Sequence, residues 1–275
     1  MIRSAIGSRL AAFSLLLSSL AVSAGPPEMR GAVEHARLLG TIPLSGQLFH
    51  VQGVEVDSAH IWVTSANRWT GRGYIHEFDR ATGKILRRVE LTDGPRFHPG
   101  GISMSGNSIW VPVAELRPNS TAVLVEIDKN TMQVRRRIRV ADHLGCVAAS
   151  GRTLIAGNWD SRLLYIFDLT GTQRVRVVRS PTRARYQDMK LVGDKLVAGG
   201  LLTGRSGSID WIDVASMRVA RSLQTGATTG TGLLNPARTY TGEGMAVEGR
   251  DLYLVPEDGP SRVFHFRMDE TLAAL

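Results

Sequence analysis

Three histidines occupy the same position in three similar segments of the sequence. His50, His98 and His143 each lie four residues before a recurring apolar residue, and Arg185 and Thr241 hold that position in two further segments. Neutral imidazole nitrogens ligate zinc and other divalent ions, and they exchange protons near neutral pH. If the fold brings the five positions together, we predict a binding or metal site there.

Carboxylate and amide groups stand beside these positions. Two residues before the apolar residue, the five segments carry Gln52, Gly100, Gly145, Gln187 and Glu243. One residue before it, Asp188 replaces the glycine or cysteine of the other segments. One hypothesis is a divalent metal cofactor held by His50, His98, His143 and Glu243. The alternative is that each histidine hydrogen-bonds a neighbouring unit of the fold and has only a structural role.

The five segments align without gaps and therefore define a repeated unit. In each, the apolar residue is followed seven positions later by another, and the first apolar residues are Val54, Ile102, Val147, Met189 and Met245. Three of the four steps between them span about 40 to 50 residues, which is the period of a four-stranded propeller blade. The fourth step is longer, which predicts a loop rich in Gly and Thr at about residues 226–238.

The end of the third strand in each unit carries a second signature. An apolar residue is followed by Asp in four of the units, as in Phe78-Asp79 and Ile127-Asp128. A tight turn is expected at Asp79–Gly83, because the aspartate accepts bonds from its own backbone and the glycine takes a positive φ. Outside the N-terminal leader no segment keeps a helical period. These patterns predict an all-β chain.

The number of units predicts a five-bladed β-propeller. It would form one domain over residues 34–275, with blades starting near residues 50, 98, 143, 185 and 241. The fifth unit ends after its third strand, and residues 35–43 would supply the missing outer strand as an N-terminal clasp. Such a clasp leaves no free inner edge. The inner strands of all blades then begin at one end of the axial channel, which we call the mouth.

The loops that leave the second strands reach the same mouth. They add aromatic, acidic and basic side chains, namely Trp69, Glu115, Arg117, Trp159, Asp160, Glu257 and Asp258. Polar groups that converge in a concave place are typical of a small-ligand site. The predicted ligand-binding set is His50, Gln52, His98, Glu115, His143, Trp159, Asp160, Arg185, Gln187, Asp188, Glu243 and Glu257.

The first 24 residues have the organisation of a signal peptide. Arg3 and Arg9 precede an apolar run from Leu10 to Leu20, and small residues end the segment at Ala24. The apolar run is too short to cross about 30 Å of hydrocarbon. We predict cleavage after Ala24, a periplasmic or secreted protein, and no membrane span in the mature chain.

Charge and cysteine content restrict the partners. The formal net charge is +8, and two of those charges belong to the leader. The densest basic cluster, Arg135–Arg139, alternates with apolar residues in an expected outer strand, where charge protects an edge from pairing. We therefore predict no nucleic-acid partner, and a monomer. Cys146 is the only cysteine, so no internal disulfide can form, and its place in the repeat predicts that it is buried.

The sequence resembles an uncharacterised family of exported bacterial propellers. The resemblance covers nearly all of the mature chain and is carried by HPGGISMSGNSIWVPVAELRPNS, HLGCVAASGRTLIAGNWDSRLLYIFD and EGMAVEGRDLYLVPEDGPSRVFHF. It implies the propeller fold and export, and it implies no activity.

More distantly, the chain is similar to the plant and bacterial glutamine cyclotransferases, exported five-bladed enzymes that close an N-terminal glutamine to pyroglutamate. The segments VQGVEV and FDRATGKIL carry this similarity, together with the five-unit layout. It implies a Gln-Gly pair in the first unit, matched by Gln52-Gly53. In the second unit that family has Gly-Glu-Gly, whose Glu is thought to shuttle the proton, and here Gly100 stands in its place. Glu243 lies in the same column of the fifth unit.

These features support three functional hypotheses. The first is an exported binding protein that holds a small polar ligand or a peptide end at the mouth, with Trp159 and Trp69 stacking and Arg117 or Arg185 pairing with an acidic group. The second is an enzyme in the same mouth, either a metal-assisted, lactonase-like hydrolase or a glutamine-cyclotransferase-like enzyme. The third is a scaffold that binds another protein across one face of the ring.

Overall fold

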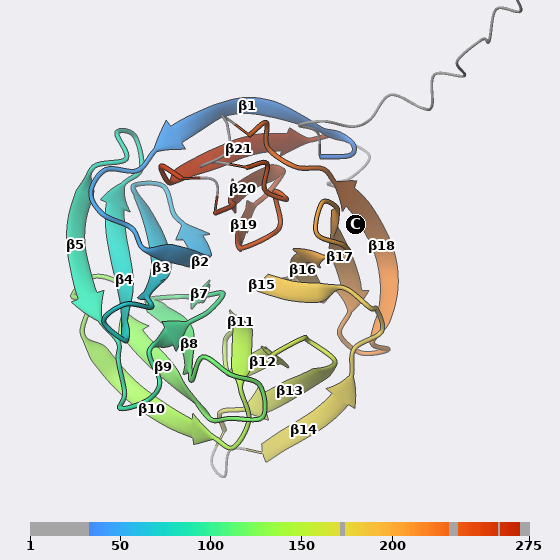
Figure 1. Cartoon of the computed structure of the whole chain (residues 1–275). Coiled ribbons are helices and arrows are strands. Elements are labelled where there is room, and N and C mark those ends of the chain that lie inside the picture. Colours follow the sequence, from blue (N-terminus) through green and yellow to red (C-terminus); the bar gives the residue numbers. More distant parts are fainter. Residues whose placement is uncertain (1–32, 171–173, 231–235, 258, 270–275) are drawn as a thin grey trace, which may run out of the picture.

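The computed structural model describes residues 33–170, 174–230, 236–257 and 259–269. The predicted signal peptide lies outside these residues. The chain forms an all-β, five-bladed propeller, as predicted, whose five small sheets surround a central axis (Figure 1). Among the described residues, none belongs to a helix of the length and hydropathy that a membrane crossing requires.

The first four blades follow the chain from the axis outward. Blade one consists of β2 (His50–Val56), β3 (His60–Asn67), β4 (Arg72–Asp79) and β5 (Ile85–Glu90). Blade two consists of β6 (His98–Pro99), β7 (Ser103–Ser105), β8 (Ser108–Ala114), β9 (Ala122–Asp128) and β10 (Val134–Val140). Blade three consists of β11 (Leu144–Ser150), β12 (Thr153–Asn158), β13 (Leu163–Asp168) and β14 (Arg174–Arg179). Blade four consists of β15 (Arg185–Val192), β16 (Lys195–Leu201), β17 (Gly207–Asp213) and β18 (Arg218–Thr225).

Blade five joins the two ends of the chain. Its inner strands are β19 (Gly244–Glu248), β20 (Asp251–Val255) and β21 (Arg262–Met268), and its outer strand is β1 (Ala36–Pro43). β1 pairs antiparallel with β21, from Ala36 opposite Met268 to Pro43 opposite Arg262. Just before β1, Val33 bridges to Thr225 of blade four. The predicted clasp is therefore confirmed, and it closes the ring (Figure 1).

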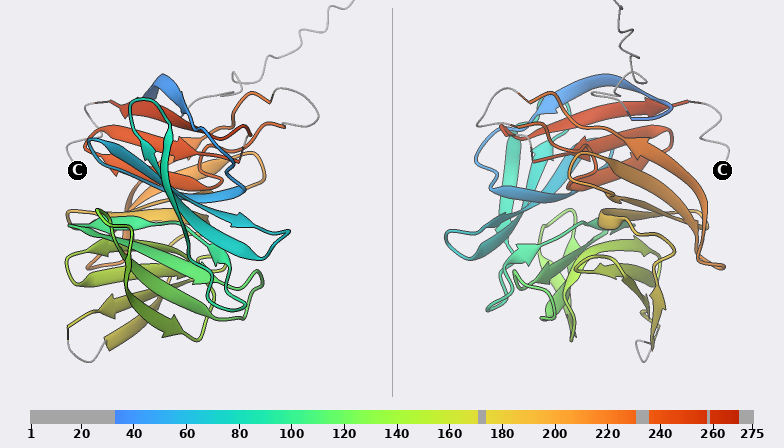
Figure 2. Two further views of the ribbon diagram at one scale, coloured as in Figure 1. Left: turned by 90° about the vertical axis from the view of Figure 1, so that its left-hand side faces the viewer. Right: turned by 45° about the vertical axis from the view of Figure 1, so that its right-hand side comes forward.

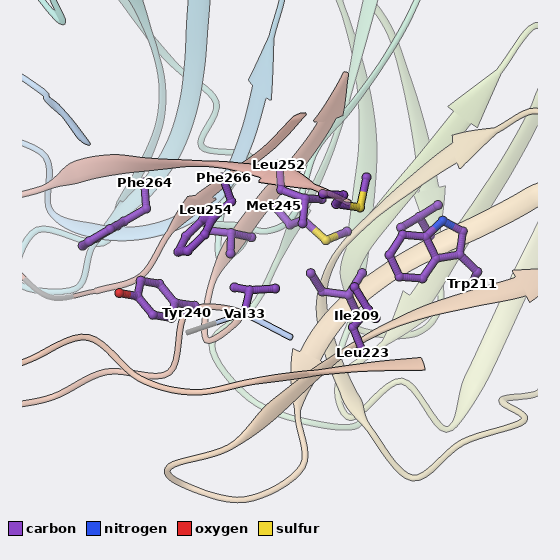
Figure 3. Packing of buried hydrophobic residues seen from close by; sticks show 12 residues of the cluster. Val33, Ile209, Trp211, Leu223, Tyr240, Met245, Leu252, Leu254, Phe264 and Phe266 are labelled. Carbon is purple, nitrogen blue, oxygen red and sulfur yellow. The ribbon is translucent and has the colours of Figure 1, made fainter. Parts of the chain in front are cut away.

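Apolar side chains fill the space between neighbouring blades in five separate clusters. The five recurring apolar residues of the inner strands are fully buried, namely Val54, Ile102, Val147, Met189 and Met245. Between blades four and five, Tyr240 packs edge-on against Phe264 and Phe266, with ring centroids 5.0 and 5.1 Å apart (Figure 3). Burial of these clusters supplies the main force that holds adjacent blades together.

The predicted turn after the third strand recurs in three blades with one geometry. Asp79 accepts a backbone hydrogen bond from Thr82, and Asp128 and Asp213 accept equivalent bonds three residues on, each 2.8 Å long. Gly83 takes the expected positive φ of 66°, whereas Met132 and Met217 adopt the same conformation without being glycine. The aspartate is thus the constant part of the signal. The turns link twisted strands, whose rotation within each blade is visible in Figure 2.

Candidate functional site

Asp188 lies on the propeller axis, where its carboxylate joins three blades. Oδ2 accepts the backbone N–H groups of Val54 in blade one and Met245 in blade five, each at 3.0 Å. Oδ1 accepts the N–H of Met189 at 2.9 Å and the ammonium of Lys190 at 2.7 Å. Burial raises the pKa of Asp188 to about 7, although Lys190 and the backbone bonds oppose that shift. The side chain is fully buried and its acceptors are occupied.

The residues around Asp188 are small because the axis has room for only one side chain. A Cβ on Gly101 would lie 2.3 Å from the carbonyl oxygen of Gln187 and 2.8 Å from Oδ1 of Asp188. A Cβ on Gly244 would lie 2.8 Å from the nitrogen of Val54. We call Asp188, Lys190, Gly53, Gly101 and Gly244 the axial plug. Asp188, which the sequence analysis assigned to the mouth, belongs to this plug.

The mouth lies one step back along the same inner strands and encloses a cavity of about 200 Å³. Most of the predicted ligand-binding residues line it, namely His50, Gln52, His98, His143, Trp159, Arg185, Gln187 and Glu243. Arg68, Leu116, Gly145 and Tyr186 complete the lining. The repeat therefore brings both predicted columns to one place, as the alignment of inner strands requires.

The histidines form a row along one side of the mouth. The ring centroids of His50 and His98 are 5.8 Å apart, and those of His98 and His143 are 6.4 Å apart. Trp159 meets His143 edge-on at 4.6 Å. Burial, together with the neighbouring imidazoles, lowers the pKa of His98 to about 3. Burial also lowers the pKa of His143, whose Nδ1 donates to the carbonyl oxygen of Arg117 at 3.1 Å. The rings of His98 and His143 are therefore uncharged at neutral pH.

Two acidic residues of blade five adjoin the His50 end of this row. Nδ1 of His50 lies 2.5 Å from Oε1 of Glu257, and Nε2 of Gln52 donates to Oε2 of Glu243 at 3.0 Å. Burial raises the pKa of Glu243 well above its usual range, and the charge of Glu257 adds to that effect. Burial has the same tendency at Glu257, but His50 and two arginines outweigh it and lower the pKa of that carboxyl. One acid is thus favoured in its protonated form and the other as a carboxylate.

Several predicted residues lie outside the lining. Glu115 accepts bonds from Thr121 and forms an ion pair with Arg117, which satisfies both charged groups locally. Asp160 is partly exposed and lies 3.4 Å from Arg162. Trp69 is 98% exposed and does not line the cavity. Asp258 falls outside the described residues.

Thr241, the fifth member of the histidine column, has a structural place. Its hydroxyl donates to the carbonyl oxygen of Gly200 at 2.9 Å and is fully buried. The column therefore contributes three imidazoles and one guanidinium to the mouth, from blades one to four.

Arg68 is the charged lining residue that the sequence analysis missed. It lies at the exit of β3, immediately before Trp69. Its charge acts on His98, Glu243 and Glu257. Successive side chains near a strand end point to opposite faces. If Trp69 points away from the cavity, its neighbour Arg68 is therefore expected to point toward it.

Sequence comparison places the chain in a family. A model described as a family of unknown function (DUF6454) matches residues 39–202, more than half of the chain. The chain belongs to this family. A comparison with curated proteins yields no sequence match.

Three solved structures are similar to this DUF6454 protein to different degrees. The crystal structure of Myxococcus xanthus glutaminyl cyclase matches with a TM-score of 0.62 and 14% identity, over 85% of this chain and 96% of that chain. Its likeness establishes the propeller fold. A mitotic checkpoint complex structure matches with a TM-score of 0.47 and 11% identity, over 96% of this chain and 100% of that chain. The Pan2 WD40 domain of Neurospora crassa matches with a TM-score of 0.46 and 8% identity, over 89% and 98%.

Proposed function

We propose that the mouth binds a small polar ligand, or the end of a peptide, through an anionic group. The observation that carries this proposal is the pair of arginines at the cavity. Arg68 and Arg185 both line it, and neither guanidinium forms an ion pair or hydrogen bond with a described residue. A guanidinium presents several donors in a fork that matches a carboxylate or phosphate, so two unpaired forks facing one cavity suit an anionic group.

Trp159 supports the same proposal on the adjoining side of the cavity. Its indole is 42% exposed while its position is held by the edge-on contact with His143. A half-exposed indole beside cations offers a flat apolar surface for the non-ionic part of a ligand. Glu243 and Gln52, which also line the cavity, can hydrogen-bond an amino or amide group. The lining therefore fits a molecule with polar groups at both ends.

The cavity limits the size of what it encloses. Its volume of about 200 Å³ is below the range of roughly 300–1,000 Å³ that is usual for drug-sized ligands. An amino acid, a small organic acid or a terminal residue of a peptide is therefore the class of ligand that we expect. A longer peptide would leave the mouth after its first or last residue.

Cyclotransferase chemistry at the position seen in the glutamine cyclotransferases is sterically closed in this ring. A Cβ on Gly100 would lie 1.9 Å from the carbonyl oxygen of Gly145. An acidic side chain at residue 100 would therefore force the inner strands of blades two and three apart. Among the carboxyl groups that line the cavity, Glu243 is the one left to take that role, and burial raises its pKa well above the usual range of a glutamate.

A binding screen with matched variants tests the proposal. The mature protein is titrated with amino acids, dipeptides of both terminal types and small dicarboxylates, first by thermal shift and then by calorimetry. We expect at least one class to bind, and R185A to weaken it tenfold or more, because a charge-assisted bond is lost. R137A removes an exposed arginine on the outer strand β10 and should leave binding unchanged.

The same screen has outcomes that contradict the proposal. Binding that R185A and W159A leave intact would place the ligand elsewhere. If no compound of the panel binds, that result would count against an anion site. Incubation with a dipeptide that begins with glutamine, followed by mass spectrometry for loss of ammonia, separates binding from cyclotransferase activity.

A further inference from the structure

The acidic side of the mouth brings three metal-binding side chains together from two blades. His50 belongs to β2 of blade one, whereas Glu243 precedes β19 and Glu257 follows β20 of blade five. One ligand atom from each of the three lies within 4.8 Å of the other two. We propose that His50, Glu243 and Glu257 form a divalent-cation site. It goes beyond the proposed ligand site, because cation binding needs no organic ligand and does not use Arg68 or Arg185.

The spacing of the three atoms is close to that of a coordination shell. Zinc bonds to histidine nitrogen and carboxylate oxygen of about 2.0–2.2 Å put tetrahedral ligand atoms about 3.4 Å apart. Nδ1 of His50 and Oε1 of Glu257 are nearer than that, at 2.5 Å, and the widest pair of the trio is within 4.8 Å. A rotation of the partly exposed Glu257 side chain that moves its carboxylate oxygen by about an ångström would therefore admit an ion.

A buried ring nitrogen in the mouth lacks the hydrogen bond that such atoms normally make. Nε2 of His98, on a ring that lines the same cavity as His50, is buried and has no partner among the described residues. Buried polar atoms are nearly always satisfied by protein or bound solvent. Nδ1 of His50 has the carboxylate of Glu257 as its contact, at 2.5 Å. A cation held by His50 and Glu257, with a coordinated water beside His98, would give Nε2 of His98 the partner that it lacks.

The donor types indicate the kind of cation. One imidazole and two carboxylates would carry a formal charge of −2 once the cation displaces the proton that burial favours on Glu243. This donor set suits zinc or a similar first-row ion, whereas calcium and magnesium prefer shells made of oxygen alone. Gln52 donates to Oε2 of Glu243 at 3.0 Å, which fixes one ligand from outside the shell. Arg68 and Arg238 act on the same carboxylates and weaken their attraction for a cation. We therefore expect micromolar rather than picomolar affinity.

Three protein ligands leave at least one coordination position free. Zinc sites with three protein ligands hold water or substrate in the remaining position, whereas purely structural sites are filled by four. Here the free position would face the 200 Å³ cavity, within the volume that the proposed ligand also uses. The site would thus place a Lewis acid beside a ligand-sized cavity, which is the arrangement that metal-assisted hydrolysis requires.

Zinc titration of the chelator-treated mature protein tests the site. Calorimetry and native mass spectrometry should show one zinc ion per chain, and calcium should bind at least a hundredfold more weakly. H50A and E257Q should each weaken zinc binding tenfold or more. H35N, which removes an exposed histidine at the opposite end of β21, is the matched control and should bind like the parent. Circular dichroism confirms that each variant is folded.

A zinc-edge anomalous map from a soaked crystal then locates the ion. A peak between His50, Glu243 and Glu257 is the expected result. Zinc binding that persists in both H50A and E257Q, a peak elsewhere, or no binding by the parent protein would overturn the proposal. R185A separates this site from the proposed ligand site, since it should lose the organic ligand and keep zinc. If H50A does not fold, E243Q and E257Q carry the same test.

Discussion

The axial plug and the mouth lie a single residue apart on the same inner strands, and both break the fivefold repetition of the chain. In the plug, Asp188 occupies a repeat position at which the other four blades carry glycine or cysteine. In the mouth, His50, His98 and His143 stand beside Arg185 in one column. The two regions differ in how their polar groups are satisfied. Asp188 receives three backbone N–H groups and an ammonium, whereas Nε2 of His98 has no partner in the described part of the chain.

This difference shows that asymmetry in a repeat is not by itself a sign of function. Five blades share one axis, and only one of them can fill it, so the plug is asymmetric for reasons of packing. Unsatisfied polar groups that face a cavity are the more specific sign, because nothing in the fold explains them. By that criterion Asp188 contributes to stability, whereas His98, Arg68 and Arg185 are the residues on which we base the proposed binding at the mouth.

Loss of the plug carboxylate should have the largest effect on stability. D188A removes the acceptor of N–H groups in three blades and leaves the buried Lys190 ammonium without its nearest carboxylate. Breaking a buried pair in this way costs about 3–5 kcal/mol of unfolding free energy. Urea denaturation measures the change, with D160A, at a partly exposed residue outside the cavity lining, as control. A loss of unfolding free energy below about 1 kcal/mol would show that the Asp188 carboxylate does not hold the blades together.

Acid should destabilise the protein through its buried histidines. The folded-state pKa values of His98 and His76 are about 3 and about 4, both lowered chiefly by burial, against about 6.5 in an unfolded chain. As the pH falls below about 6.5, the unfolded chain takes up protons that the folded chain does not. Stability is therefore lost between neutral pH and pH 4, by about 2 kcal/mol per histidine at pH 5.

The variant H98Q isolates the contribution from the mouth. The difference in unfolding free energy between pH 7.5 and pH 5, measured in the presence of a chelator, should be smaller in H98Q than in the parent by about 2 kcal/mol. H35N, at an exposed position, should keep the parent's pH dependence. Equal pH dependence in H98Q and the parent would mean that the His98 ring is accessible to protons in the folded state.

Removing a mouth arginine should have the smallest effect on folding. Arg185 is exposed and forms no ion pair with a described residue, so R185A should change the unfolding free energy by less than about 0.5 kcal/mol. The measurement is urea denaturation beside R137A. Marked destabilisation by R185A alone would place this side chain among the groups that hold blades three and four together.

The fold could be predicted from the sequence because every blade must bury the same inner positions. The five recurring apolar residues of the inner strands, the aspartate turns and the clasp formed by residues 35–43 are all local or repeated signals. The two columns of the mouth followed from the repeat for the same reason. Cys146 is buried as predicted, and burial raises the pKa of its thiol to about 12.

The remaining site residues depend on distances that a repeat does not contain. The carboxylate of Asp188 accepts N–H groups from blades one and five, so its role depends on the radius of the ring. Trp69 and Trp159 follow equivalent strands, but only Trp159 lines the cavity, two residues before Ser161 with its φ of 55°. Glu115 forms an ion pair with Arg117, two residues away, and does not line the cavity. These outcomes depend on loop geometry, which the unit-to-unit alignment does not specify.

The most direct test of the distinction between plug and mouth is to measure H98A and E243Q for both stability and binding. The account predicts that each variant melts within a few degrees of the parent at pH 7.5, while zinc binding is lost in E243Q and binding of the organic ligand is lost in both. Strong destabilisation by both variants, with zinc and ligand still bound, would contradict it. His98 and Glu243 would then be contacts between blades, like Asp188.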